Sequence, residues 1–173
     1  TQSIPAGAGV TPGTCTVTVD VTASLGGSYT NTLAAGALQT SNGNNAAAAS
    51  ATLTVNAAAP TVAKAFNLAT INAGATSTLT ITLTNANTSV ASLTAALTDS
   101  LPSGVVIAGT PNASTSCTGV GALVATAGAS TITLPATRTI PAGTGVTAGI
   151  CTVTVDVTAS LGGSYTNTLA AGA

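Results

Sequence analysis

Three polar residues stand where strand-like segments of this chain place apolar ones. Lys64, Asp99 and Asn167 lie in VAKAF (62–66), SLTAALTD (92–99) and SYTNTL (164–169), each in phase with the larger apolar residues of its segment. Successive side chains of a strand point to opposite faces, so all three are expected to point into a core. A buried charge is costly unless it is paired, which predicts that these residues interact with one another.

One arrangement that uses all three is an intramolecular isopeptide bond. Burial favours a neutral lysine amine, and a neutral amine is a nucleophile that could attack the carboxamide of Asn167. A protonated Asp99 would polarise the carbonyl and shuttle protons, ammonia would leave, and an amide would remain. Two other interpretations stay open: a plain Lys64–Asp99 ion pair hydrogen-bonded to Asn167, or a Lys64 side chain that extends to solvent at the end of the strand.

The chain also repeats itself. The stretch CTVTVDVTASLGGSYTNTLAAGA occurs at 15–37 and again at 151–173, and residues 1–37 match 137–173 at an offset of 136 with five differences. Similarity at a fixed spacing is typical of repeat proteins. We therefore interpret 1–59 as the C-terminal part of a preceding repeat plus a linker, and 60–173 as most of the following β-sandwich repeat.

The repeat shows which cysteines occupy equivalent positions and which are expected to pair. Cys15 and Cys151 occupy the same repeat position, and Cys117 stands 34 residues before Cys151 (117 to 151), so the partner of Cys15 is expected before residue 1. Cys151 is in phase with the valines of CTVTVDVT and is predicted to point inward. A Cys117–Cys151 disulfide would stabilise the fold by about 3–4 kcal/mol, and it would imply an oxidising, extracytoplasmic compartment. The alternative is two free buried thiols.

Composition argues against several function classes. Charged residues make up 3%, aromatic residues 2%, histidine is absent, and the formal net charge is −1. This gives no electrostatic basis for binding nucleic acid, and no apolar run is long enough to insert into a membrane. Clusters that could bind calcium or zinc are missing from the sequence, as is a nucleophile–histidine pair. We expect no cofactor, no metal and no enzymatic activity on a substrate.

Strand patterns extend over the whole chain. Alternation of Thr with Val, Leu or Ile, separated by Gly, Pro and Asn turn signals, predicts eight or nine short strands per period and no amphipathic helix. The fold class predicted is all-β, with Ig-like β-sandwich repeats in tandem. A parallel β-helix would need a period of about 20–30 residues, which is not visible. The predicted strands are 16–22, 52–55, 62–66, 78–84, 92–99, 104–108, 121–127, 131–135, 151–158 and 164–169.

Five short motifs, in their order along the chain, resemble those of a known family. They are Lys64, Thr78–Asn85, Asp99–Gly104, Cys151–Val157 and Tyr165–Asn167. This series resembles the conserved Ig-like repeat domain of unknown function found in tandem in large bacterial cell-surface proteins. The resemblance implies an extracellular, cell-surface protein of many β-sandwich repeats and supplies no activity. It also implies that Lys64, Asp99 and Asn167 match an isopeptide triad, while TAALTDSLPSG is richer in alanine than the family pattern.

These observations predict a structural subunit of an extracellular fibre, stalk or sheath, braced by disulfide and isopeptide bonds. Its expected partners are identical repeats or chains, and the duplicated 1–37 segment could complete a neighbour's sandwich by strand exchange. The alternative is a spacer repeat of a surface adhesin that binds glycan or ice. Threonine rows occur on ice-binding surfaces, but threonine is also an ordinary solvent-facing strand residue, and core-phase aromatics leave no platform for glycan.

Overall fold

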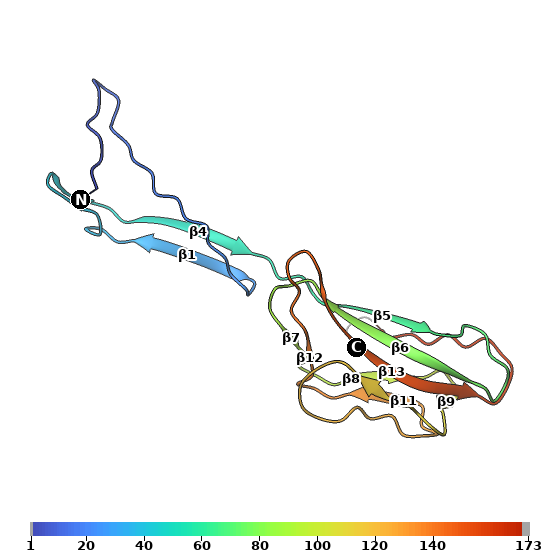
Figure 1. Cartoon of the computed structure of the whole chain (residues 1–173). Helices are drawn as coiled ribbons and strands as arrows, with labels where there is room; N and C mark the ends of the chain where they lie inside the picture. The colour runs from blue at the N-terminus through green and yellow to red at the C-terminus, as the bar shows by residue number, and fades with distance from the viewer. Residues whose placement is uncertain (1, 171–173) are drawn as a thin grey trace.

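The protein is all-β. The computed structural model describes residues 2–170, which form thirteen strands and no helix. Thr1 and the last three residues of the predicted 60–173 domain lie outside the described residues. Figure 1 shows a long hairpin at one end of the molecule and the strands from residue 60 onwards gathered at the other. No helix long and apolar enough to cross a membrane occurs in 2–170.

The hairpin is formed by β1 (Gly27–Leu33) and β4 (Ala49–Val55), which pair antiparallel along their whole length. Tyr29 stands opposite Leu53 in this register. A smaller hairpin, β2 (Gln39–Thr40) with β3 (Gly43–Asn44), lies between them in the chain. All but one of the residues of β1 and β4 are exposed, because no second layer covers this two-stranded sheet.

A five-stranded antiparallel sheet forms the first layer of 60–170. Its strand order is β10 (Ser114–Thr115), β13 (Gly149–Ala159), β6 (Thr76–Asn85) and β5 (Thr61–Phe66), and β9 (Val105–Ile107) also pairs with β13. Alternation in β6 and β13 decides which face is buried, since the Leu and Ile residues of β6 and the valines of β13 point inward and the threonines of both strands outward. The buried members are Leu79, Ile81, Leu83, Val153, Val155 and Val157.

Two small sheets cover the apolar face of this layer. β8 (Leu97–Ser100) pairs with β11 (Thr131–Leu134), and β7 (Ala91–Ser92) pairs with β12 (Thr139–Ile140). Their buried residues Ile132, Leu134 and Ile140 belong to the same core cluster as the inward residues of β6 and β13. One hydrophobic core therefore lies between the two sets of strands.

Two of the predicted strands between residues 92 and 127 differ from the structure. The stretch 121–127 forms no strand and contributes a single bridge, Val124 to Thr133. Gly119 before it and Gly121 at its start have positive φ angles of 112° and 88°, which turn the backbone out of the extended conformation. The predicted strand 92–99 is divided into β7 and β8, because at 93–96 the backbone leaves the ladder and Leu93 pairs instead with 137–138.

The two copies of the repeated sequence adopt different structures. Residues 152–158 lie in β13, whereas 16–22, predicted as a strand, form none. Val153 is 1% exposed and its counterpart Val17 is 91% exposed. Residues 27–33 form β1, whereas their copy 163–169 is extended without a strand partner, so the predicted strand 164–169 is not formed. A strand needs a neighbour to pair with, and the two copies have different neighbours.

Features held by nearby residues are the same in both copies. The backbone N–H of Ala8 donates to Thr11 O at 2.9 Å, and that of Thr144 donates to Thr147 O at 2.8 Å. The hydroxyl of Tyr29 donates to Leu25 O at 3.0 Å, and Tyr165 repeats this bond to Leu161 O at 3.0 Å. Local contacts therefore follow from the sequence alone, while the strand pairing depends on context.

A chain of two asparagines fixes the linker between the hairpin and 60–170. Asn85 is fully buried and its Nδ2 donates to Pro141 O at 3.0 Å, while its Oδ1 accepts from Asn87. Asn87 in turn accepts from Ala58 N at 2.9 Å and donates to Ala58 O at 2.8 Å. Both backbone groups of one linker residue are thus bound by a single carboxamide.

The repeat offers a matched test of this fold. Val153→Ala should lower the free energy of unfolding by about 2–3 kcal/mol, because two methyl groups leave a packed core. Val17→Ala, the same change at the same repeat position, should alter it by less than about 0.5 kcal/mol. Chemical denaturation followed by circular dichroism measures both. Equal effects at the two positions would contradict the difference in burial.

Candidate functional site

The three polar residues that strand alternation predicted to point inward come from three separate parts of the fold. Lys64 lies on the edge strand β5, opposite Ile81 of β6. Asp99 lies on β8 in the facing layer, opposite Ile132 of β11. Asn167 lies in the extended segment 163–169. Each belongs to a different part of the protein, so any contact among them joins the two layers and this segment.

The structure brings the three side chains together. Lys64 Nζ lies 2.6 Å from Asp99 Oδ1, and Asn167 Nδ2 donates to Asp99 Oδ2 at 2.9 Å. The side chains of Lys64 and Asp99 are 13% and 1% exposed. Lys64 therefore does not extend to solvent, and the carboxylate of Asp99 binds one partner with each oxygen.

One atom of the cluster has no partner. Asn167 Oδ1 is buried and accepts no hydrogen bond. Rotating the carboxamide by half a turn would place this oxygen against Asp99 Oδ2, where it would be stabilised only if Asp99 carried a proton. A proton passed from Lys64 to Asp99 along their short contact would create that donor and leave a neutral amine. The cluster can therefore hold either an ion pair or a neutral amine beside a polarised amide carbonyl.

Tyr165 positions the segment that carries Asn167. Its ring lies over Gly104, where a Cβ would be only 2.9 Å from Tyr165 Cε1, and the φ of +92° at Gly104 is also a conformation that favours glycine. The hydroxyl of Tyr165 is tied to Leu161 O. Tyr165 and Leu169 pack against the core cluster on either side of Asn167. The inward side of the segment is thus anchored by side chains.

A family model, described as a domain of unknown function, DUF7933, matches residues 1–55 and 60–173. The chain belongs to the DUF7933 family. This confirms the resemblance to a conserved domain of unknown function, which rested on the motifs from Lys64 to Asn167. No curated protein and no solved structure matches the chain.

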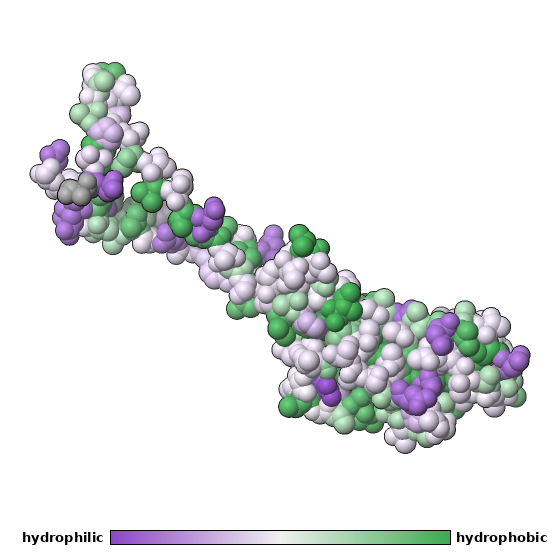
Figure 2. Space-filling view, in the orientation of Figure 1, coloured by the Kyte–Doolittle hydropathy of each residue, from purple (hydrophilic) through white to green (hydrophobic). Residues whose placement is uncertain are grey.

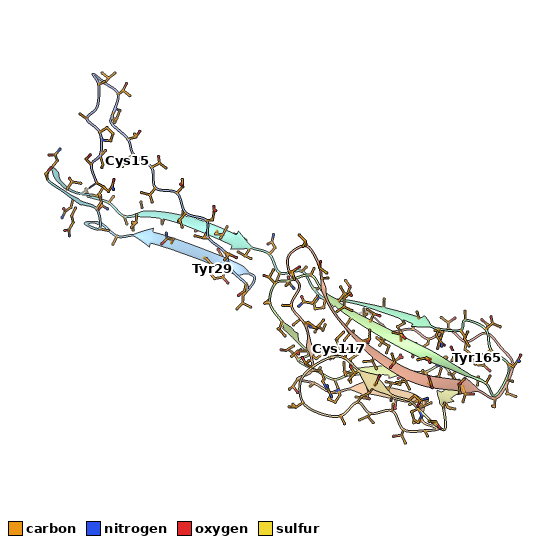
Figure 3. All side chains as sticks on the ribbon, viewed as in Figure 1. Cys15, Tyr29, Cys117 and Tyr165 are labelled. Carbon is orange, nitrogen blue, oxygen red and sulfur yellow. A yellow bond between two sulfur atoms is a disulfide. The ribbon has the colours of Figure 1, made fainter. Side chains whose placement is uncertain are left out.

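Besides the Lys64–Asp99–Asn167 contacts, a disulfide connects two parts of this DUF7933 chain. Cys117 and Cys151 are bonded, with Cα atoms 4.9 Å apart, and both are buried. The bond joins the loop after β10 to β13, as expected from the spacing, and it suggests an oxidising environment. Cys15, the repeat counterpart of Cys151, is exposed and unbonded. Figure 3 labels Cys15 in the N-terminal part of the chain and Cys117 among the strands of 60–170.

Sequence reasoning missed the polar contacts of Arg138 and Asp156. Arg138, which replaces Gln2 of the other copy, donates to Cys117 O at 2.7 Å and also to Gly121 O, so it binds the irregular loop that follows the disulfide. Asp156 accepts from Thr78 Oγ1 at 2.6 Å and from Asn112 Nδ2 at 2.7 Å. The only signal for Arg138 was its exchange for glutamine. Residues 2–170 contain no group of three acidic, Cys or His side chains arranged to hold a metal ion.

The burial of Asp99 predicts a stability difference between two variants that both lack the lysine. Lys64→Met leaves an unpaired carboxylate in the interior, and breaking a buried pair in this way costs about 3–5 kcal/mol. Adding Asp99→Asn removes the charge and should recover a large part of that loss. Neither variant can form a lysine crosslink, so denaturant unfolding compares them directly. A double variant no more stable than Lys64→Met would contradict a buried, charged Asp99.

Proposed function

We propose that this chain is a structural subunit of an extracellular fibre, stalk or sheath built from tandem Ig-like β-sandwich repeats. The observation that carries the proposal is the contact of Lys64 and Asn167 with the two oxygens of Asp99. It spans both layers and the final segment, so a bond formed there closes the fold around its core. The family match supplies no activity, and the proposal concerns mechanical support only.

The proposed chemistry is the formation of an amide between Lys64 and Asn167. Neutral Nζ attacks Cγ of Asn167, a C–N bond forms, and the bond from Cγ to Nδ2 breaks. The nitrogen leaves as ammonia, and Asp99 first donates a proton to the carbonyl oxygen and then relays a proton to the leaving group. No oxidant, metal or cofactor enters this balance, because an amine and a carboxamide give an amide and ammonia.

The repeat boundaries fit this role. We propose that 1–59 closes one sandwich and supplies a linker, and that 60–173 forms most of the next. The Asn87–Ala58 contacts support a stiff connection between them. The disulfide supports an extracellular location at the cell surface.

Lateral association is supported by the outer face of the five-stranded sheet. Thr82 pairs with Thr152 and Thr80 with Thr154, and Ala63 and Ala65 of β5 extend the same rows. The space-filling view in Figure 2 shows mostly pale, weakly polar surface over 60–170, with few strongly hydrophilic patches. A face with so little charge lacks the repulsion that usually keeps strands apart, so side-by-side packing of identical chains is proposed.

The covalent bond is tested by intact mass. The reduced, denatured chain should weigh one ammonia less than its sequence, and peptide mapping should locate the loss to Lys64 and Asn167. Asn167→Ala and Asp99→Ala should restore the full mass. Asn31→Ala is the matched control, since Asn31 occupies the same repeat position in a hairpin without lysine or aspartate, and the loss should persist. An undiminished mass in the wild-type chain would rule out the bond.

The structural role is tested by sedimentation velocity over a wide range of chain concentrations, followed by electron microscopy. A fibre subunit should self-associate without added ligand into elongated particles. The spacer of an adhesin should instead stay monomeric and respond only to a glycan or to ice. A chain that remains monomeric at every concentration would contradict the fibre role.

A further inference from the structure

The sequence contains two acceptor motifs for N-linked glycosylation, Asn-X-Ser/Thr with X other than proline. They are Asn87-Thr88-Ser89 and Asn112-Ala113-Ser114. Such motifs are modified on the surface of exported proteins, and the Cys117–Cys151 disulfide suggests an oxidising environment of that kind. A folded asparagine can carry a sugar only if its carboxamide nitrogen has a hydrogen to give up, so the hydrogen bonds of the two side chains distinguish the two motifs.

Both N–H groups of the Asn87 carboxamide already donate hydrogen bonds. Its Nδ2 donates to Ala58 O at 2.8 Å and to Asn85 Oδ1 at 2.9 Å. An N-linked sugar replaces one of the two hydrogens on this nitrogen. Attachment at Asn87 would therefore break either the bond to the linker or the bond to the fully buried Asn85, and leaving a buried polar group without its partner is costly.

Asn112 differs in exposure and in the use of its carboxamide. It is exposed in the loop 108–113 between β9 and β10, where its φ angle is +43°. Its Nδ2 donates one hydrogen bond, to Asp156 Oδ2 at 2.7 Å, and within residues 2–170 nothing accepts from its second N–H. A sugar can replace that second hydrogen while the bond to Asp156 is kept.

Asp156 holds the loop that carries Asn112. Its backbone N–H donates to Pro111 O at 2.8 Å, and its backbone C=O accepts from Ala108 N at 2.9 Å. Its carboxylate accepts from Asn112 with one oxygen and from Thr78 with the other. Every polar group of Asp156 is thus used, and the loop is bound to β13 at three points. The exposed carboxamide of Asn112 is therefore presented to solvent at a defined position beside the five-stranded sheet.

We propose that Asn112 is an acceptor for an N-linked oligosaccharide and that Asn87 is not. The donor is an oligosaccharide carried on a lipid phosphate, and an asparagine oligosaccharyltransferase catalyses the transfer. The bond from the anomeric carbon of the first sugar to the phosphate oxygen breaks, and a bond from that carbon to Nδ2 of Asn112 forms. Nδ2 gives one proton to a base of the transferase, and the lipid phosphate leaves with the electron pair of the broken bond.

The sugar would lie at the edge of the threonine-rich outer face of the five-stranded sheet. Asp156 stands opposite Thr78 in the ladder of β13 and β6, and Thr154 opposite Thr80 is the next pair on the same face. An oligosaccharide is bulky and solubilising, so it would give this face the polar surface that a chain with 3% charged residues lacks. A fibre subunit and an adhesin spacer can both carry it, and the assignment of Asn112 does not depend on either role.

Glycosylation of the purified, folded chain tests the assignment. The chain is incubated with a single-subunit oligosaccharyltransferase that accepts Asn-X-Ser/Thr and with its lipid-linked oligosaccharide, and peptide mapping by mass spectrometry follows both motifs. Asn112 should be modified about tenfold faster than Asn87, because only Asn87 must give up a hydrogen bond of a partly buried network. Synthetic peptides 82–92 and 106–116 contain the same two motifs without the fold, and they should be modified at similar rates.

Substitutions of the serines supply the controls. Ser114→Ala should abolish modification of Asn112 and Ser114→Thr should retain it, because the motif requires a hydroxyl residue two positions after the asparagine. Ser89→Ala is the matched change in the other motif and should leave the modification of Asn112 unaltered. A folded chain that is modified equally fast at Asn87, or that stays unmodified at Asn112, would overturn the assignment.

Discussion

β13 is paired with β6 from Gly149 opposite Asn85 to Thr158 opposite Thr76. This ladder places the valines of one strand beside the leucines and isoleucine of the other, so it creates the apolar face on which the small sheets pack. It also places Cys151 inside, next to Cys117, and sets β5 at the sheet edge with Lys64 over the core. In the first copy, where the equivalent of β6 is absent from the described residues, the same valines are exposed and Cys15 is unbonded.

Alternation of apolar residues predicted β6, β11 and β13, and it placed Lys64, Asp99 and Asn167 on the inward side of their segments. Period-two patterns work here because one face of each strand meets a core. The same pattern was wrong for 16–22. Alternation predicts which face of a strand is apolar, but it does not provide a second strand with which the segment can pair. It also missed the bends at Gly119 and Gly121, where the predicted strand 121–127 was to begin, and the contacts of Asn85, Asn87 and Arg138. Those side chains bind backbone groups far away in sequence, and the identity of such groups is fixed only by the completed fold.

Because only 3% of its residues are charged, the chain can form few ion pairs. The single lysine and a fully buried aspartate are placed against each other, and the remaining arginine binds backbone carbonyls. Stability must then come from apolar burial, the backbone ladders and the Cys117–Cys151 disulfide. This distribution would suit the proposed fibre subunit, because two surfaces poor in charge repel each other little and their contact is little affected by salt.

The two hydrogen bonds between Asn87 and the backbone of Ala58 restrain the conformation of the linker. Holding both the N–H and the C=O of one linker residue restrains rotation about the backbone at the point where the hairpin passes into the next set of strands. In a row of such units the angle between neighbours would be nearly the same at every junction, and a constant angle adds up along the row. The row would then wind into a helix whose pitch and hand are set by that one angle. A single carboxamide would determine the shape of an object many times its own length.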